Sequence, residues 1–180
     1  MEFVPFKKDL TMKNTVPHLM GFFLILVSSA ALLMMAGRGW SYMDLPIFHM
    51  GLLLLGASII LAGFSHRITA LFLSIIIIAL QFIHILGFPD LHTVLPVPLL
   101  VAYSGSMILL TRRHYHAGQT LAYITGIVSY ALVMTHLTGV VEVVEALRVD
   151  PTISAELLMA AVGLLGLYPP GESLNHSSQE

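Results

Sequence analysis

The sequence contains no cysteine and few charged residues. With no cysteine among 180 residues, disulfides, thiolate metal ligands, iron–sulfur clusters and cysteine nucleophiles are excluded within the chain. Only 10% of the residues are charged, whereas soluble domains carry about 25%. The net charge is −2, so the composition provides no basic surface for nucleic acid, and we expect no nucleic-acid partner.

Motifs that mark common catalytic sites are also missing. The sequence contains no glycine-rich phosphate loop, no GxSxG nucleophile elbow and no HExxH zinc motif. No polar segment is long enough to form a separate catalytic domain. These absences favour a protein that is not an enzyme on its own.

Long apolar segments make up most of the chain, in which 57% of the residues are hydrophobic. The segments are continuous runs and lack the alternation of amphipathic elements, which is typical of membrane spans. We therefore predict an all-α fold, a polytopic transmembrane bundle with six spans and short loops, as a single integral membrane domain over residues 1–180. The predicted spans are residues 16–36, 45–64, 68–88, 94–111, 118–140 and 152–168.

The sixth segment differs from the other five in carrying an acidic residue. It is short and carries Glu156 near its start, so a five-span arrangement is the alternative. The polar residues 169–180 lack apolar side chains to bury and are predicted to be disordered.

The distribution of lysine and arginine predicts the orientation in the cell membrane. If the N-terminus is cytoplasmic, six basic residues lie inside and two outside, as the positive-inside rule requires. The inside residues are Lys7, Lys8, Lys13, Arg67, Arg112 and Arg113, and the outside residues are Arg38 and Arg148.

Three histidines fall at similar depth near the predicted outer side. His49 lies about four residues into the second span, and His84 and His136 lie about four residues before the third and fifth spans end. At 1.5 Å per residue, each is roughly 6 Å below the outer boundary. His92 lies in the loop just above them. Ionisable residues at such positions are functional candidates.

Helical spacing indicates which side chains share a face with these histidines. Gln81 precedes His84 by three residues and therefore lies on the same face. His49, Gly56 and Gly63 repeat every seven residues, which predicts a small-residue seam against another helix. His49, His84, His136 and Gln81 are thus our candidate cofactor-binding residues. Ordinary helix packing is the alternative explanation, because polar and small residues line helix interfaces in any bundle.

Imidazole nitrogens suggest which cofactors such a layer would hold. His49, His84, His92 and His136 are candidate ligands of a metal, with copper or a b-type haem as the leading possibilities. A quinone carbonyl could instead accept a hydrogen bond from a histidine and Gln81.

The expected function follows from the apolar chain and the histidine layer. The leading hypothesis is a small integral membrane subunit of a larger redox or oxygenase-type complex, with the lipid bilayer and other membrane subunits as partners. In this hypothesis it scaffolds helices and contributes histidines to an outer-side metal, haem or quinone site. The alternatives are a small transporter or channel for a neutral or cationic solute, and a purely structural assembly subunit.

Overall fold

The computed structural model describes residues 15–37, 44–64, 66–87, 96–138 and 151–167. The side chains of Asp44, Leu45, Pro46, His84 and Pro151 are outside this description. Within the described ranges there are six helices and no strand, which confirms the all-α prediction for this part of the chain. The helices are α1 (Thr15–Gly37), α2 (Asp44–Gly63), α3 (Arg67–Gly87), α4 (Pro96–Thr111), α5 (Tyr115–Thr138) and α7 (Pro151–Leu167).

The helix boundaries follow from residues that start or stop helices. Helices α1, α2 and α3 all end at a glycine, the residue most often found where a helix terminates. Helices α4 and α7 begin at Pro96 and Pro151, where the missing N–H of proline costs no hydrogen bond. Each helix therefore coincides with a predicted apolar segment, and its ends differ from the prediction by three residues or fewer.

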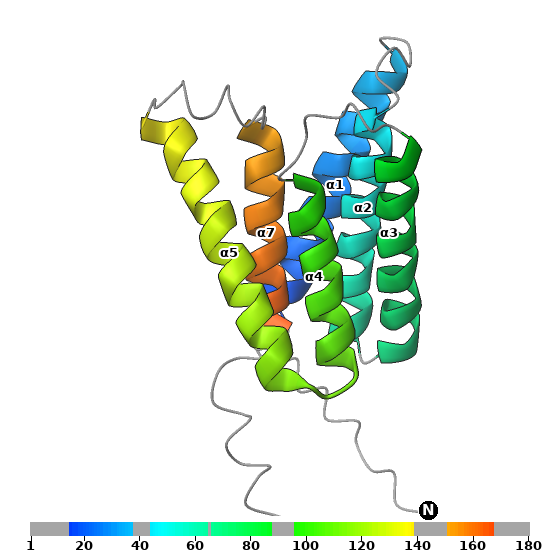
Figure 1. Cartoon of the computed structure of the whole chain (residues 1–180), viewed down its shortest axis with the longest axis vertical. Coiled ribbons are helices and arrows are strands. Elements are labelled where there is room, and N and C mark those ends of the chain that lie inside the picture. The colour runs from blue at the N-terminus through cyan, green and yellow to red at the C-terminus, as the bar shows by residue number, and fades with distance from the viewer. Residues whose placement is uncertain (1–14, 38–43, 65, 88–95, 139–150, 168–180) are drawn as a thin grey trace, which may run out of the picture.

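The six helices run alternately up and down (Figure 1), and their contacts divide them into an inner and an outer set. Helices α2, α4 and α7 contact one another and make an inner triangle. Each outer helix packs against two inner ones: α1 against α2 and α7, α3 against α2 and α4, and α5 against α4 and α7. The fold thus consists of three helical hairpins, each with one outer and one inner helix. The three inner helices all run in the same direction.

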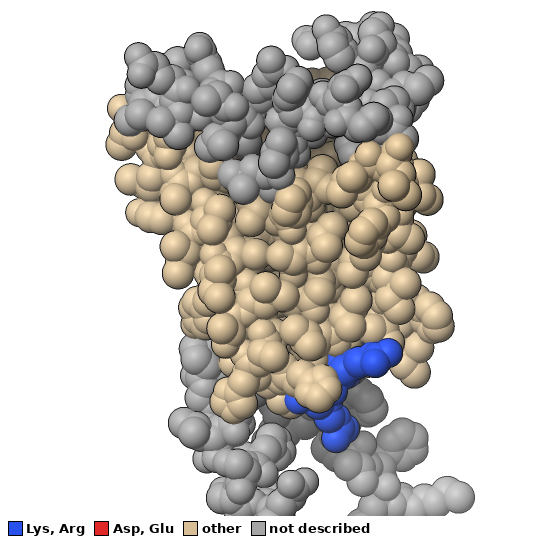
Figure 2. Space-filling view, in the orientation of Figure 1, with Lys and Arg blue, Asp and Glu red and all other residues tan. Residues whose placement is uncertain are grey.

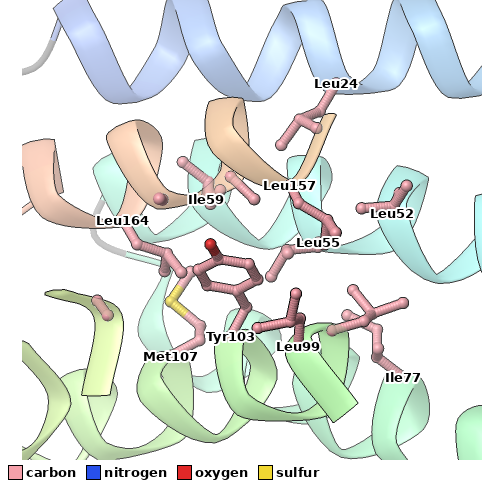
Figure 3. Packing of buried hydrophobic residues seen from close by; sticks show 14 of the residues in the cluster. Leu24, Leu52, Leu55, Ile59, Ile77, Leu99, Tyr103, Met107, Leu157 and Leu164 are labelled. Atoms are coloured by element: carbon pink, nitrogen blue, oxygen red, sulfur yellow. The ribbon is translucent and has the colours of Figure 1, made fainter. Parts of the chain in front are cut away.

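Burial follows the same division into inner and outer helices. Leu55 of α2, Tyr103 of α4 and Leu157 of α7 are fully buried members of one core cluster (Figure 3). Large apolar side chains are nevertheless exposed on the outside of the bundle. Those that the structure describes lie on α1, α3 or α5, with the exceptions of Met50, Phe64 and Val162. The outer helices therefore present an apolar surface around most of the bundle.

Two of the helices, α1 and α5, are long and apolar enough to cross a membrane by length and composition. The other four described helices carry shorter apolar stretches of 10–17 residues. The structure thus supports a helical protein with two candidate membrane-spanning helices.

Candidate functional site

A close backbone approach fixes the register between α1 and α2. A Cβ atom added to Gly56 would lie 2.7 Å from the carbonyl oxygen of Gly21, and one added to Gly21 would lie 2.8 Å from that of Gly56. The small-residue seam predicted on α2 therefore packs against α1. Because the two helices are antiparallel, moving seven residues from this pair toward the upper end of Figure 1 brings Ser28 level with His49.

Helix α7 packs on α1 in a matching register. A Cβ added to Gly163 would lie 3.2 Å from Cβ of Met20, and one added to Gly166 would lie 3.2 Å from Cδ of Pro17. These two helices are also antiparallel (Figure 1). The same register, continued upward, places Glu156 beside Ser28.

The three side chains meet where α1, α2 and α7 join. The Ser28 hydroxyl donates a hydrogen bond of 3.2 Å to Oε1 of Glu156. Nδ1 of His49 lies 3.4 Å from Oε2 of Glu156, within ion-pair distance but without the alignment of a hydrogen bond. The side chain of Glu156 is 0% exposed and that of His49 is 4% exposed. We call Ser28, His49 and Glu156 the polar centre.

Burial limits the charge that the polar centre can carry. Moving an ion from water into a low-dielectric interior costs several kcal/mol, so a net charge here is unfavourable. With one proton shared by Glu156 and His49, the pair is neutral overall, either as a carboxylic acid with a neutral imidazole or as a carboxylate with an imidazolium. Losing that proton makes the pair negative, and adding a second makes it positive. A charge on either group is therefore least costly when the other group carries the opposite charge.

Gln81 lies on a different side of α2 from the polar centre. Its side-chain nitrogen donates a hydrogen bond of 3.4 Å to the carbonyl oxygen of Ile47 and lies 2.8 Å from where a Cβ of Gly51 would be. Ile47 and Gly51 each stand two residues from His49, which corresponds to about 200° of rotation around the helix. The structure therefore does not bring Gln81 and His49 together.

The remaining predicted site residues lie on other helices or outside the described ranges. His136 is half-buried near the end of α5, and its Nε2 is buried with no hydrogen-bond partner among the described residues. His84 belongs to α3, but its side chain is not described, and His92 lies outside the described residues. The described residues contain no group of three or more histidine or acidic side chains suited to a metal ion. The shared histidine site remains a prediction.

Sequence reasoning missed Glu156 and Ser28 as site residues. Glu156 is the only acidic residue within the six predicted spans, and that isolation was the available signal. A carboxylate near the start of a short segment argues against a sixth span, but a carboxylate in an apolar helix equally indicates a buried partner. Ser28 gave no comparable signal, because serine is common within helix interfaces.

Comparisons with protein-family models, curated proteins and solved structures found no match to this chain. The interpretation of the site therefore rests on its own contacts. Those contacts make the polar centre the strongest candidate functional site among the described residues.

Proposed function

We propose that all six helices cross a membrane and that the protein is a small proton-coupled carrier for a neutral or cationic solute. The apolar surface on α1, α3 and α5 supports the membrane location, because soluble monomers rarely expose contiguous apolar surface on this scale. A bilayer would cover this surface on all sides of the bundle. The excess of basic residues on one side supports a cytoplasmic N-terminus.

The helix lengths are compatible with six crossings. The described helices have between 16 and 24 residues, which corresponds to about 24–36 Å against a hydrocarbon core of roughly 30 Å. The shortest, α4 and α7, belong to the inner triangle. There they are surrounded mainly by protein, so a short span exposes little backbone to lipid.

The observation that carries the proposed activity is the burial of Glu156. A carboxyl group that is 0% exposed in an apolar bundle, with His49 and Ser28 as its described polar neighbours, has a high desolvation cost in its ionised form. Ionisable residues retained inside membrane bundles commonly belong to proton relays or ion pathways. Glu156 would bind and release the coupling proton, and His49 would balance its charge.

A proton-coupled cycle follows from the charge states of this pair. The neutral, one-proton state is compatible with burial, so the bundle can close around it. Loss of the proton leaves a net negative charge that favours either hydration or binding of a cationic solute. The protein would thus alternate between a protonated closed form and a deprotonated form that admits its solute.

Proton transfer by Glu156 can be tested in vesicles. The purified protein is reconstituted with a pH-sensitive dye inside, and proton uptake is driven by a potassium diffusion potential. We expect uptake above that of protein-free vesicles, and we expect Glu156→Gln to abolish the excess. Infrared spectra recorded across pH should show the carbonyl band of a protonated carboxylic acid that Glu156→Gln removes.

Glu142, which lies outside the described residues, provides a matched control. Glu142→Gln removes the same type of group and is expected to leave both signals unchanged. If Glu156→Gln retains full proton uptake and the carboxylic acid band, the assignment of Glu156 is wrong. If Glu156→Gln and Glu142→Gln lose proton uptake equally, the loss reflects a general effect of removing a carboxylate and does not support a specific role of Glu156.

A membrane subunit of a redox complex is the second candidate function. The contact between Oε2 of Glu156 and Nδ1 of His49 favours it, because a carboxylate on one ring nitrogen commonly orients a histidine whose other nitrogen binds a metal. Nε2 of His49 would then be available to copper, a b-type haem or a quinone. His136 would be a further ligand if the helices bring it close.

Cofactor content separates the two candidates. Metal analysis and a visible spectrum of the protein, purified with any subunits that accompany it, would detect copper or haem. A stoichiometric signal that is lost in His49→Ala would favour the redox subunit. Proton uptake by the metal-free protein would favour the carrier.

A further inference from the structure

One end of the bundle carries all of the described arginines. Arg67 begins α3, and Arg112 and Arg113 follow α4, so all three lie at the lower end of Figure 1. Figure 2 shows the blue arginine surface at this end, below an otherwise uncharged face. The two described acidic residues belong to the opposite half, because Asp44 begins α2 and Glu156 lies in the second turn of α7. We call this the basic end.

A hydrogen bond connects the two turns that form the basic end. Nη1 of Arg67 donates to the phenol oxygen of Tyr115 at 3.4 Å, which links the start of α3 to the start of α5. Arg112 and Arg113 are exposed, and their guanidinium groups form no ion pair or hydrogen bond with the described residues. The basic end thus presents free guanidinium groups beside a fixed one.

The backbone at Arg113 adopts a conformation that is uncommon for a residue other than glycine. The amide of Arg113 donates to the carbonyl oxygen of Leu110, and that of His114 to the oxygen of Leu109. This is the Schellman pattern that ends a helix with one residue in the left-handed conformation, a position usually occupied by glycine. Arg113 holds it with φ of 65°. A strained non-glycine residue is a reason to look for function.

We propose that the basic end binds the phosphate of an anionic phospholipid headgroup. This inference rests on the proposed membrane location, because helix ends at a bilayer surface lie at the level of lipid phosphates. Guanidinium groups match phosphate oxygens through paired N–H donors. Arg112 and Arg113 would hold the phosphate, and Arg67, fixed by Tyr115, would add a third positive charge at its edge.

Native mass spectrometry of the detergent-solubilised protein tests this site. Phosphatidylglycerol is titrated into the wild type and Arg113→Gly, with phosphatidylcholine and inorganic phosphate in separate titrations. We expect the wild type to bind phosphatidylglycerol more tightly than phosphatidylcholine, and Arg113→Gly to bind it about fivefold more weakly, the usual effect of one basic residue near anionic lipid.

Arg113→Gly is not expected to disturb the fold, so a loss of lipid binding by this variant cannot be attributed to misfolding. Glycine fits the left-handed conformation better than arginine, so Arg113→Gly should melt at the wild-type temperature or above it without lipid. Arg148→Gly, outside the described residues and on the predicted opposite side, should bind phosphatidylglycerol like the wild type. Glu156→Gln should also bind it normally, so failure of the carrier proposal and failure of the lipid site are distinguishable.

Three results would overturn the inference. The first is unchanged phosphatidylglycerol binding by Arg113→Gly. The second is equal affinity of the wild type for phosphatidylcholine. The third is displacement of phosphatidylglycerol by inorganic phosphate at comparable concentration, which would indicate a site for free phosphate.

Discussion

Glu156 contacts His49 of α2 and Ser28 of α1. The contribution of each contact to the free energy of unfolding can be measured separately. We expect Glu156→Gln and His49→Gln each to lower the free energy of unfolding, because each leaves a buried polar partner poorly satisfied. The double variant should be less destabilised than the sum of the single variants, by about 0.5–3 kcal/mol, since both remove the same contact. Titration with sodium dodecyl sulfate in mixed micelles measures these values. Strict additivity would show that the two groups do not interact.

The Ser28 hydroxyl has a well-matched control in Ser58. Ser28 donates to Glu156 across the α1–α7 interface, whereas buried Ser58 donates only to the carbonyl oxygen of Leu54 in its own helix. Ser28→Ala should therefore lower the free energy of unfolding by about 1 kcal/mol, the usual net value of such a bond. Ser58→Ala should change the free energy of unfolding less, because the carbonyl oxygen of Leu54 keeps its helical backbone hydrogen bond when the Ser58 hydroxyl is removed. If Ser28→Ala and Ser58→Ala lower the free energy of unfolding equally in the same assay, the hydrogen bond between Ser28 and Glu156 is contradicted.

At the scale of helices, the contact between Gly21 and Gly56 sets how closely α1 and α2 approach. Gly56→Ala should destabilise the protein by about 1–3 kcal/mol, because the new methyl group meets a backbone oxygen that cannot move alone. Gly105→Ala in α4 is the control, since its nearest neighbour would be a side-chain atom at 3.7 Å. Alanine is the better helix former, so this variant should be neutral or more stable. Thermal unfolding in detergent compares the two.

Helix positions were predictable from the sequence, whereas helix partners were not. Runs of apolar residues between glycine and proline locate a helix because these signals are local. The side that a helix turns toward its neighbour is harder to predict when apolar residues surround it almost completely. Gly56 and Gly63 revealed one packing face, but the sequence did not show that α1 would cover it. The same difficulty applies to His49 and Gln81, because Gln81 of α3 contacts α2 at Ile47 and Gly51, about 200° around the helix from His49.

The whole molecule has two distinct ends, and their placement across a membrane can be tested directly. The chain lacks cysteine, so His114→Cys and Thr138→Cys each introduce a single thiol at an exposed position on opposite ends of the bundle. We expect a membrane-impermeant maleimide to label Thr138→Cys in intact cells and His114→Cys only after the membrane is opened. Labelling of His114→Cys but not Thr138→Cys in intact cells would contradict the orientation, and labelling of both would contradict the placement of the two ends on opposite sides of a membrane.

The packing of α7 against α1 implies an order of assembly. During synthesis α1 is made before α7, and Ser28 forms its hydrogen bond with Glu156, which lies 128 positions later in the chain. The first two hairpins can form while translation continues, but the polar centre cannot exist before the third hairpin arrives. A chain that stops before α7 would therefore lack the polar centre even if its earlier helices form. Formation of the polar centre thus requires that α7 has packed against both α1 and α2.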